Sequence, residues 1–290
     1  MMTPQPQILI ADSGSTKTTW CLLSGNRKKM VRTQGISPYF QTGTQMEDIF
    51  NKELLPGLGR AAARVERVCY YGTGCADPKN AAVVKRALRK VFAGAKLQVT
   101  HDLMGAARAL CGRSAGIACI LGTGSSICYF NGRTIPESDP GLGYILGDEG
   151  SGAYLGRKVL QHYLYHFFDP ELTARFEEKY DTDRSEILDK IYKEPLANRY
   201  LASCSLFLQE NRGHKAVESI LEEGLDDFFF RHIYRYAGRR KAPVHFVGGI
   251  AHGYRDVVRM LCKAYELTCG NILKAPMDGL VAYHKKEAAG

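Results

Sequence analysis

A glycine- and hydroxyl-rich stretch near the start of the chain combines residue types that could bind phosphate and a metal ion. Residues 12–18 read Asp-Ser-Gly-Ser-Thr-Lys-Thr and separate two apolar runs, 8–11 and 19–23. Strand-forming runs around a tight glycine turn predict a β-hairpin. Glycine lets backbone N–H groups approach an anion, and Asp12 could hold Mg²⁺ beside it. We expect this hairpin to bind the phosphates of ATP, although an ordinary turn has the same composition.

A second copy of the arrangement strengthens this interpretation. Residues 120–127 read Ile-Leu-Gly-Thr-Gly-Ser-Ser-Ile, and Gly124 lies 110 positions after Gly14. Asp12 corresponds to Gly122, so only the first copy offers a carboxylate. Two such hairpins predict a protein of two lobes that clamps a triphosphate from both sides. Neither copy has the spacing of a Walker loop.

An isolated carboxylate, Asp102, follows a strand-like run and precedes a helical pattern. Ligands of open α/β sheets bind beyond the carboxyl ends of the strands, which is where this residue is expected. There it could accept the proton of an attacking sugar hydroxyl and orient that hydroxyl for phosphoryl transfer. The alternative is a helix cap, because a carboxylate at a helix start can accept hydrogen bonds from free N–H groups.

The most distinctive segment is the glycine-rich stretch 141–152. Its composition fits neither a helix nor an ordinary strand, and its spacing is not that of a dinucleotide-binding loop. Asp148 could accept hydrogen bonds from sugar hydroxyls. Alternatively, Asp148 and Glu149 could cap the helix that follows. A further glycine pair, Gly248 and Gly249, ends a strand and would let a flat adenine ring lie close to the backbone, although a plain strand-to-helix turn looks the same.

The elements that position these residues alternate along the chain. Strands are expected at 30–33, 65–71, 96–100, 116–130 (a hairpin) and 244–247. Helices are expected at 44–54, near 61, and at 80–92, 103–110, 151–167, 254–265 and 277–286, with 170–240 largely helical. An Asn-Gly pair at 131–132 predicts a type I′ turn. This alternation indicates an α/β protein whose sheets are covered on both faces. We expect a first lobe at 1–113, a second at 114–276, and a C-terminal helix at 277–290 that packs back on the first.

Bulk properties narrow the function classes. The chain has 290 residues, 45% of them hydrophobic and 24% charged, as in a globular protein. No apolar run approaches the roughly 20 residues that span a bilayer, and residues 1–7 do not resemble a signal peptide, so we expect no membrane and a cytoplasmic location. The nine cysteines are scattered without a paired spacing, which predicts free thiols. The formal charge of +9 is dispersed, so we expect no nucleic-acid partner.

Together these segments resemble the N-acetylglucosamine kinase family, over nearly the whole chain. That family belongs to the actin-like, sugar-kinase and Hsp70 ATPase fold, and its bacterial branch is often grouped with ATPases that activate benzoyl-CoA reductase and 2-hydroxyacyl-CoA dehydratase. The resemblance implies two ribonuclease H-like lobes with a central cleft, and a helical insertion at about 170–240 in the second. It also implies transfer of the γ-phosphate of ATP to an amino sugar, at C6, with Mg²⁺.

The resemblance also implies a role for each residue. Asp102 would be the catalytic base, and Asp12 would hold Mg²⁺. Nucleotide-binding residues would be Ser13, Gly14, Ser15, Thr16, Lys17, Thr123, Gly124, Gly248, Gly249, Ile250 and Gly253. Sugar-binding residues would be Ser37, Ser125, Ser126, Gly141, Leu142, Gly143 and Asp148.

Three positions depart from the family pattern and leave the sugar open. Asparagine is common where this chain has Ser126 and near Ser37, and tryptophan occurs in some members where it has Leu142. N-acetylglucosamine, N-acetylmuramic acid and glucosamine all remain candidates. Two other functions compete: an ATPase that activates a reductase, and a sensor of sugar or nucleotide without catalysis. Homodimers are common in the family, so the resemblance makes a homodimer one candidate assembly.

Overall fold

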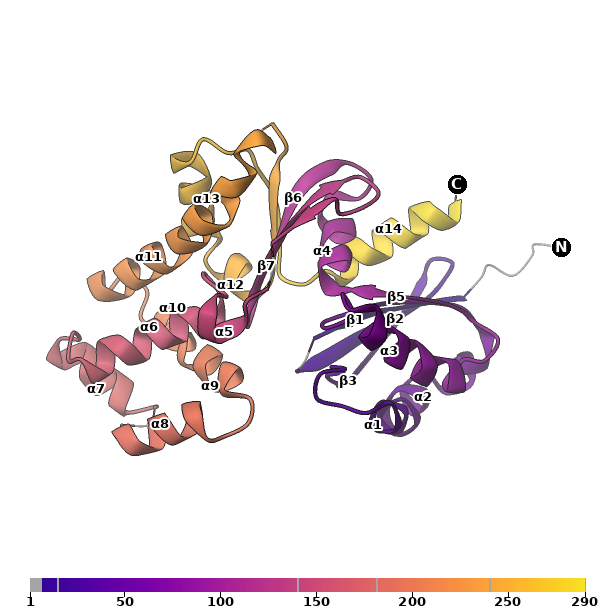
Figure 1. The fold of residues 1–290 in the computed structure, drawn as a ribbon, viewed down its shortest axis with the longest axis horizontal. Coiled ribbons are helices and arrows are strands. Elements are labelled where there is room, and N and C mark those ends of the chain that lie inside the picture. The colour runs from indigo at the N-terminus through magenta and orange to yellow at the C-terminus, as the bar shows by residue number, and fades with distance from the viewer. Residues whose placement is uncertain (1–6, 15, 140, 181, 240, 290) are drawn as a thin grey trace. The chain divides into compact units, whose positions relative to one another are not determined.

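Two units, each built on one sheet, make up the chain in the computed structural model (Figure 1). The structure describes residues 7–14, 16–139, 141–180, 182–239 and 241–289. The first unit comprises Met1–Arg113 with Pro276–Gly290, and the second comprises Ser114–Ala275. None of the helices in the described parts is both long enough and apolar enough to span a lipid bilayer.

The first sheet has its earliest strand in the middle. Its strands are β1 (Gln7–Ser13), β2 (Lys17–Ser24), β3 (Arg27–Gln34), β4 (Val65–Gly72) and β5 (Lys96–His101). They lie in the order β3-β2-β1-β4-β5. The three strands β1 to β3 form an antiparallel meander, whereas β4 is parallel to β1 and β5 to β4. The carboxyl ends of β1, β4 and β5 therefore lie at one edge of the sheet.

Both faces of this sheet are covered, because its central strands alternate apolar side chains between them. Leu9 and Ala11 face one core, and Ile8 and Ile10 face the other. The first core is closed by α1 (Gly43–Ile49), η1 (Phe50–Leu54), α2 (Leu55–Leu58), η2 (Gly59–Arg64) and α3 (Pro78–Val91). The second is closed by α4 (Asp102–Cys111) and α14 (Met277–Ala289). The two helices α4 and α14 lie side by side in Figure 1.

The second sheet repeats the topology of the first. Its strands are β6 (Ala115–Leu121), β7 (Ser125–Asn131), β8 (Glu137–Ser138), β9 (Val244–Val247) and β10 (Cys269–Leu273). Their order is β10-β9-β6-β7-β8, with a meander from β6 to β8 and with β9 and β10 running parallel to β6. The two predicted hairpins, β1–β2 and β6–β7, are thus confirmed and occupy equivalent places in their sheets.

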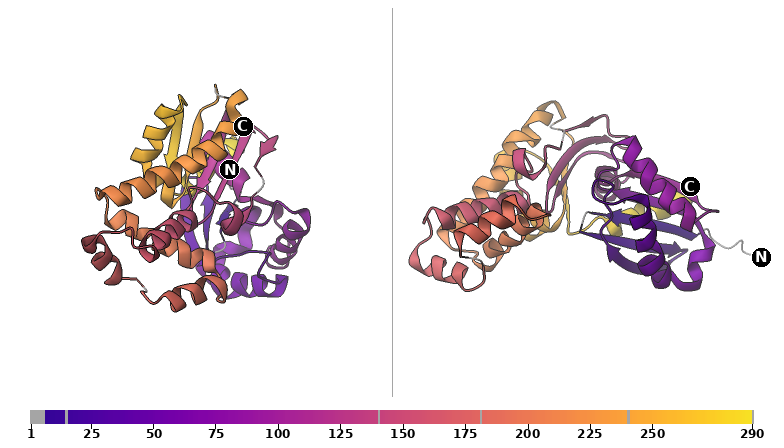
Figure 2. Two further views of the ribbon diagram at one scale, coloured as in Figure 1. Left: turned by 60° about the vertical axis from the view of Figure 1, so that its left-hand side comes forward. Right: turned by 60° about the horizontal axis from the view of Figure 1, so that its bottom comes forward.

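Most helices of the second unit come between β8 and β9. They are α5 (Gly143–Leu146), α6 (Gly152–Leu164), α7 (Pro170–Glu177), α8 (Arg184–Tyr192), α9 (Ala197–Cys204), α10 (Leu206–Glu210), α11 (Lys215–Arg231) and η3 (Ile233–Arg239). Figure 2 shows these helices, in pink to orange, gathered to one side of the strands. After β9 follow α12 (Gly249–Gly253) and α13 (Arg255–Ala264). Aromatic residues fill the core that the helices of the second unit share, and Phe176 and Phe207 are fully buried there.

Two expectations about local structure were wrong, and one edge strand of the second sheet was not predicted. The turn after β7 is not type I′, because Gly132 has a positive φ of 93° while Asn131 does not. Instead, the side-chain oxygen of Asn131 accepts hydrogen bonds from the N–H groups of Arg133 and Thr134, which closes an Asx-type turn. The glycine-rich stretch does contain a short helix, α5. Strand β10, at the sheet edge, had no sequence signal of its own.

A buried network of polar side chains attaches α14 to the first sheet. Arg108 donates to the hydroxyl of Tyr71 at 2.7 Å, and that hydroxyl lies 2.8 Å from Nε2 of His284. Nδ1 of His284 lies 2.9 Å from the carboxylate of Glu287, which also pairs with Arg67 at 2.8 Å. The carboxylate can only accept, so Nδ1 carries the proton, and Nε2 is free to accept from Tyr71. Burial lowers the pKa of His284 from 6.5 to about 4.

The network predicts loss of stability in acid. The unfolded chain protonates His284 near pH 6.5 and the folded chain only near pH 4, so this stabilisation is complete above pH 6.5 and lost as the pH falls toward 4. We expect the free energy of unfolding to fall by about 3 kcal/mol from this group by pH 4, at about 1.4 kcal/mol per tenfold difference in proton affinity. Denaturant titrations followed through Trp20, the sole tryptophan and a buried residue of the first unit, measure it.

The matched variant is His284→Gln, which keeps a hydrogen-bonding amide but does not titrate. It should lose at least about 1 kcal/mol less than the wild type over the same pH range. The hydrogen bond from His284 and the charge of Arg67 lower the pKa of Glu287. The glutamine amide can replace that hydrogen bond and Arg67 is kept, so the two proteins differ chiefly in the titration of His284. An equal loss in both proteins would show that His284 does not govern acid stability.

Candidate functional site

Two carboxylates meet at the carboxyl edge of the first sheet. Asp12 is the penultimate residue of β1, and Asp102 follows β5 directly as the first residue of α4. The strand register places Asp12 opposite Tyr71 of β4 and Tyr71 opposite Thr100 of β5, so one strand separates the two positions. The structure thus brings together the two acidic residues that the sequence singled out.

Burial makes both carboxylates harder to ionise. It raises the pKa of Asp12 to about 7, with the charge of Asp102 adding to the effect and that of Lys17 opposing it. Burial also raises the pKa of Asp102, against hydrogen bonds from the backbone of Leu103 and the hydroxyl of Thr73. Asp102 accepts from the N–H of Leu103 at 2.9 Å, although the cap position of α4 belongs to His101. A capping role therefore describes only part of this side chain's environment.

The first predicted phosphate turn joins β1 to β2. The N–H of Gly14 donates to the carbonyl of Lys17, and the described turn residues Gly14, Thr16 and Lys17 are exposed. Ser13 differs from them, because its hydroxyl is buried and lies 2.7 Å from that of Thr18. Its side chain thus stabilises the hairpin rather than facing the exposed turn. Ser15, also predicted to bind nucleotide, lies outside the described residues.

Ser37, predicted to bind sugar, has a polar atom without a partner. The side chain is buried, and its Oγ makes no hydrogen bond in the structure. The surrounding loop is held by other groups: the Ser37 N–H donates to the Gln41 side chain at 2.9 Å, and the Ser37 carbonyl accepts from Phe40. An unsatisfied buried hydroxyl costs free energy, which a ligand hydrogen bond would offset.

The second predicted phosphate turn is fixed by the helix that follows the glycine-rich stretch. The N–H groups of Gly152 and Ala153, at the start of α6, donate to the carbonyls of Gly122 and Thr123 at 2.8 and 3.0 Å. Gly124 approaches the carboxylate of Asp148 so closely that a β-carbon there would lie 2.9 Å from its Oδ2. The turn, the helix and Asp148 are therefore positioned together.

Gly248 is required by the backbone at the end of β9. Its φ of 130° disfavours any other residue, and a β-carbon would lie 2.1 Å from the carbonyl oxygen of Leu121. A β-carbon at Gly249 or Gly253 would instead have no neighbouring atom within 4 Å, so the faces of these two glycines are open. Ile250, between them on α12, is partly buried. Of the four residues predicted to contact adenosine, Gly248 is therefore required by close backbone packing, whereas Gly249 and Gly253 leave α12 accessible.

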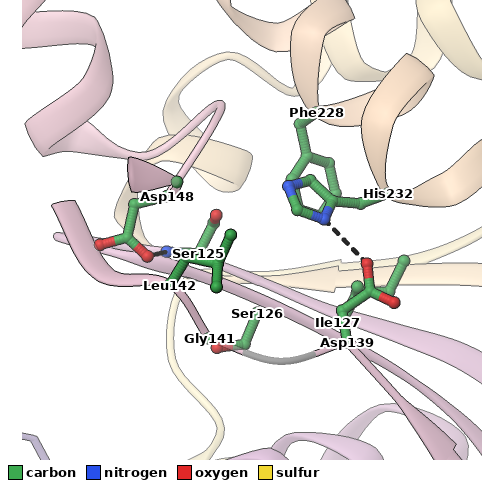
Figure 3. Close-up of a pocket in the computed structure, with 10 residues that line it drawn as sticks. Ser125, Ser126, Ile127, Asp139, Gly141, Leu142, Asp148, Phe228 and His232 are labelled. Carbon is green, nitrogen blue, oxygen red and sulfur yellow. Dashed lines mark hydrogen bonds and ion pairs between the residues drawn. The ribbon is translucent and has the colours of Figure 1, made fainter. Parts of the chain in front are cut away.

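A hollow of about 310 Å³, including space open to solvent, lies in the second unit (Figure 3). Its walls come from β7, the loop after β8, the glycine-rich stretch and α11. The lining residues are Ser125, Ser126, Ile127, Asp139, Gly141, Leu142, Gly147, Asp148, Phe228 and His232. Five of the seven residues predicted to bind sugar are among them, whereas Gly143, an exposed residue of α5, and Ser37 of the first unit are not.

Asp148 presents a carboxylate to this hollow from an unusual backbone conformation. Its φ is 56°, in the left-handed region that non-glycine residues rarely adopt. Oδ1 accepts from the N–H of Ser125 at 3.2 Å, and burial raises the pKa of the carboxyl. The alternative that Asp148 and Glu149 cap α6 is wrong: Ser151 is the cap and accepts from the N–H of Tyr154 at 3.1 Å.

Five residues of the hollow were not predicted to bind sugar, and two of them, Ile127 and Gly147, lie in the predicted hairpin and the glycine-rich stretch. Asp139, Phe228 and His232 lie outside the glycine-rich stretch, and none belongs to a recognisable pattern. The one available signal was the aromatic run 228–230 on a helix that is otherwise charged. Tertiary folding brings α11, which packs on α6 and α13, and the loop after β8 to the glycine-rich stretch.

Comparison with solved structures identifies the fold. The ROK hexokinase of Thermus thermophilus aligns with 96% of this chain and 96% of its own, at 15% identity and a TM-score of 0.56. A candidate N-acetylglucosamine kinase from Chromobacterium violaceum aligns over 96% of this chain and 99% of its own, at 18% identity and a TM-score of 0.71. The fold is therefore that of the two-lobed, actin-like sugar kinases.

A further structure identifies the family. A candidate N-acetylglucosamine kinase from Porphyromonas gingivalis is 40% identical, with 96% of this chain and 99% of that chain aligned and a TM-score of 0.93. The chain belongs to the N-acetylglucosamine kinase family. No model of a protein family matches the sequence.

Two curated relatives agree over shorter stretches. The N-acetylmuramic acid/N-acetylglucosamine kinase of Clostridium acetobutylicum is 28% identical over 132 residues, and the N-acetyl-D-glucosamine kinase of Dictyostelium discoideum is 24% identical over 170. The aligned regions span 42% and 52% of the lengths of these two relatives.

Proposed function

We propose that the protein is an ATP-dependent kinase that transfers the γ-phosphate to the C6 hydroxyl of N-acetylglucosamine. The observation that carries the proposal is the pair of desolvated carboxylates, Asp12 and Asp102, at the carboxyl edge of the first sheet. The kinase names of the relatives, together with the hollow beside Asp148, support an amino sugar as the acceptor.

Asp102 is proposed as the catalytic base. A base works best when its pKa approaches the working pH, and burial moves the pKa of Asp102 upward in that direction. The side chain would accept a hydrogen bond from the sugar hydroxyl, orient its oxygen toward the γ-phosphate and take up its proton as the new P–O bond forms. The β–γ bridging oxygen leaves with ADP.

The residues of the first sheet edge fit Mg²⁺. This ion is usually held by one or two carboxylates together with substrate phosphates and water, not by a cage of protein ligands. Among the described residues no group of three His, Cys, Asp or Glu side chains is arranged to hold a metal ion, whereas Asp12 stands at the edge with Asp102 near it. Asp12 would hold the ion, which when bound neutralises phosphate charge. A cation there would also relieve the cost of two neighbouring carboxylates that are partly shielded from water.

The other residues predicted from the sequence to contact nucleotide or sugar are proposed in the same roles. Backbone and side-chain donors of Gly14, Thr16, Lys17, Thr123 and Gly124 would bind phosphates, and Gly248, Gly249, Ile250 and Gly253 would contact adenosine. Ser37, Ser125, Ser126, Gly141, Leu142, Gly143 and Asp148 would bind the sugar. Within this set, Ser37 and Asp148 have the clearest support, because each has a partly or fully buried oxygen open to a further hydrogen bond.

The direct test is release of ADP from Mg·ATP in the presence of N-acetylglucosamine. Asp102→Asn keeps the shape of the side chain but cannot take up a proton, so kcat should fall at least about 100-fold while sugar affinity changes little. Phosphorus–proton NMR of the product should show the phosphate on C6. The control is Asp77→Asn, since Asp77 is exposed and caps α3, a role that asparagine fills as well.

Two outcomes would contradict the proposal. Full turnover by Asp102→Asn would remove this residue from catalysis. Sugar binding by the wild type without sugar-dependent ADP release would instead favour a sensor.

The charges around the hollow predict discrimination against acidic sugars. Its lining includes the carboxylates of Asp139 and Asp148 and one basic group, His232, whose ring nitrogens both lie 2.9 Å from carboxylates. Within the described lining, no cation is left to pair with a substrate carboxylate. We therefore expect kcat/KM for N-acetylmuramic acid to be at least about tenfold below that for N-acetylglucosamine, a difference of about 1.4 kcal/mol.

The methyl ester of N-acetylmuramic acid separates charge from bulk in this comparison. It keeps the lactyl substituent without the negative charge, so it should recover much of the lost kcat/KM. Equal rates with N-acetylglucosamine and N-acetylmuramic acid would contradict the electrostatic argument.

A further inference from the structure

His232 joins two loops of the second unit that are far from it in sequence. It stands directly after α11, and its Nδ1 lies 2.9 Å from Oδ2 of Asp139, in the loop after β8. Its Nε2 lies 2.9 Å from Oε2 of Glu149, in the glycine-rich stretch. Figure 3 shows the bond to Asp139 at the wall of the hollow. Neither His232 nor its two partners has a place in the proposed chemistry.

Both ring nitrogens of His232 face a carboxylate oxygen. Ionised carboxylates only accept hydrogen bonds, so a ring that donates to both of them is an imidazolium. The side chains of Asp139 and Glu149 are only 9% and 12% exposed, so their charges need a partner. Among the side chains that the structure describes, the imidazolium is the cation that pairs with both.

Other groups around the cluster are weaker substitutes. Arg235 approaches Asp139 at 3.6 Å and Arg231 approaches Glu149 at 3.7 Å, but both arginines are more than half exposed. The hydroxyl of Tyr236 donates to Asp139 at 3.4 Å. The ring of Phe228 packs beside His232 with centroids 5.1 Å apart, and the carboxylate of Asp148 contributes a further negative charge nearby.

The two loops held by His232 carry the sugar-facing groups. Asp139 precedes the stretch with Gly141 and Leu142, and Glu149 follows Asp148 directly. The left-handed backbone of Asp148 persists only if its surroundings hold it, and Glu149 is its neighbour in that turn. The anchor at Glu149 therefore bears on the orientation of the Asp148 carboxylate.

We propose that His232 is a positioning residue of the sugar site: its imidazolium links Asp139 to Glu149 and so fixes Asp148, Gly141 and Leu142 before the sugar binds. The inference rests on the proposed function, and it assigns His232 no part in phosphoryl transfer. Loss of the link weakens sugar binding, because ordering the two loops when the sugar binds costs free energy that reduces the affinity.

The first test uses His232→Gln, whose neutral amide can donate to one carboxylate but not to both. The KM for N-acetylglucosamine, and its Kd by calorimetry, should rise at least about tenfold, while kcat at saturating sugar stays within about threefold. His232→Lys restores a cation between the carboxylates and should recover part of the affinity. The control His166→Gln makes the same replacement at an exposed site of the second unit. A fall in kcat with unchanged KM would overturn the proposal.

The second test does not depend on activity. In sugar-free protein, His232→Gln should speed amide hydrogen exchange at least about tenfold at Asp139, Gly141, Leu142 and residues 147–151, with the rest of the second unit unchanged. If the wild type neither binds nor phosphorylates N-acetylglucosamine, the proposed function fails, but this measurement still decides the role of His232. Unchanged exchange in the two loops, or equal loss of protection throughout the second unit, would overturn it.

Discussion

The cost of burying negative charge is the constraint on which the site of the first unit depends. Asp12 and Asp102 stand at the ends of strands with a low-dielectric sheet behind them, and the charge of Asp102 makes Asp12 still harder to ionise. Lys17 offsets part of this cost but is itself exposed. A cation at Asp12 and a hydroxyl proton at Asp102 would offset the remaining cost of these charges. This edge of the sheet therefore favours a metal ion and a sugar hydroxyl, both of which a sugar kinase must bind.

The second unit uses the same topology for a different task. Its first strand is followed by Gly122 where the first unit has Asp12, and the carboxylates come instead from loops beside the sheet. Here the constraint is order rather than charge alone. Asp148 stands in a left-handed turn, where its carboxylate accepts from the N–H of Ser125 and its neighbour Glu149 lies 2.9 Å from His232. The repeated sheet thus provides a scaffold on which the two units place different chemistry.

Much of the fold could be predicted because it follows from local patterns. The two hairpins, the parallel strands β4 and β5 and the helices α3 and α13 all have regular apolar spacing or clear turn residues. Strand β10 could not be, since it includes Gly270 and Asn271 and is only half-buried, so it lacks the composition of a strand. Residues 269–273 form a strand because they pair with β9 in the sheet.

The site could be predicted only where its residues adjoin glycine-rich turns or strand ends. Asp12, Asp102 and Asp148 each stand beside a strand end or a break that the sequence makes visible. His232 and Asp139 are 93 positions apart and come together only in the folded protein, so no local sequence pattern predicts their contact. Their partnership is a property of the tertiary structure.

The most direct measurement is a crystal structure with N-acetylglucosamine, Mg²⁺ and a non-hydrolysable ATP analogue bound together. Our account predicts the C6 oxygen within about 3 Å of the Asp102 carboxylate, and ring hydroxyls donating to Asp148. A sugar bound away from the hollow of the second unit, or with its C6 oxygen out of reach of Asp102, would contradict it.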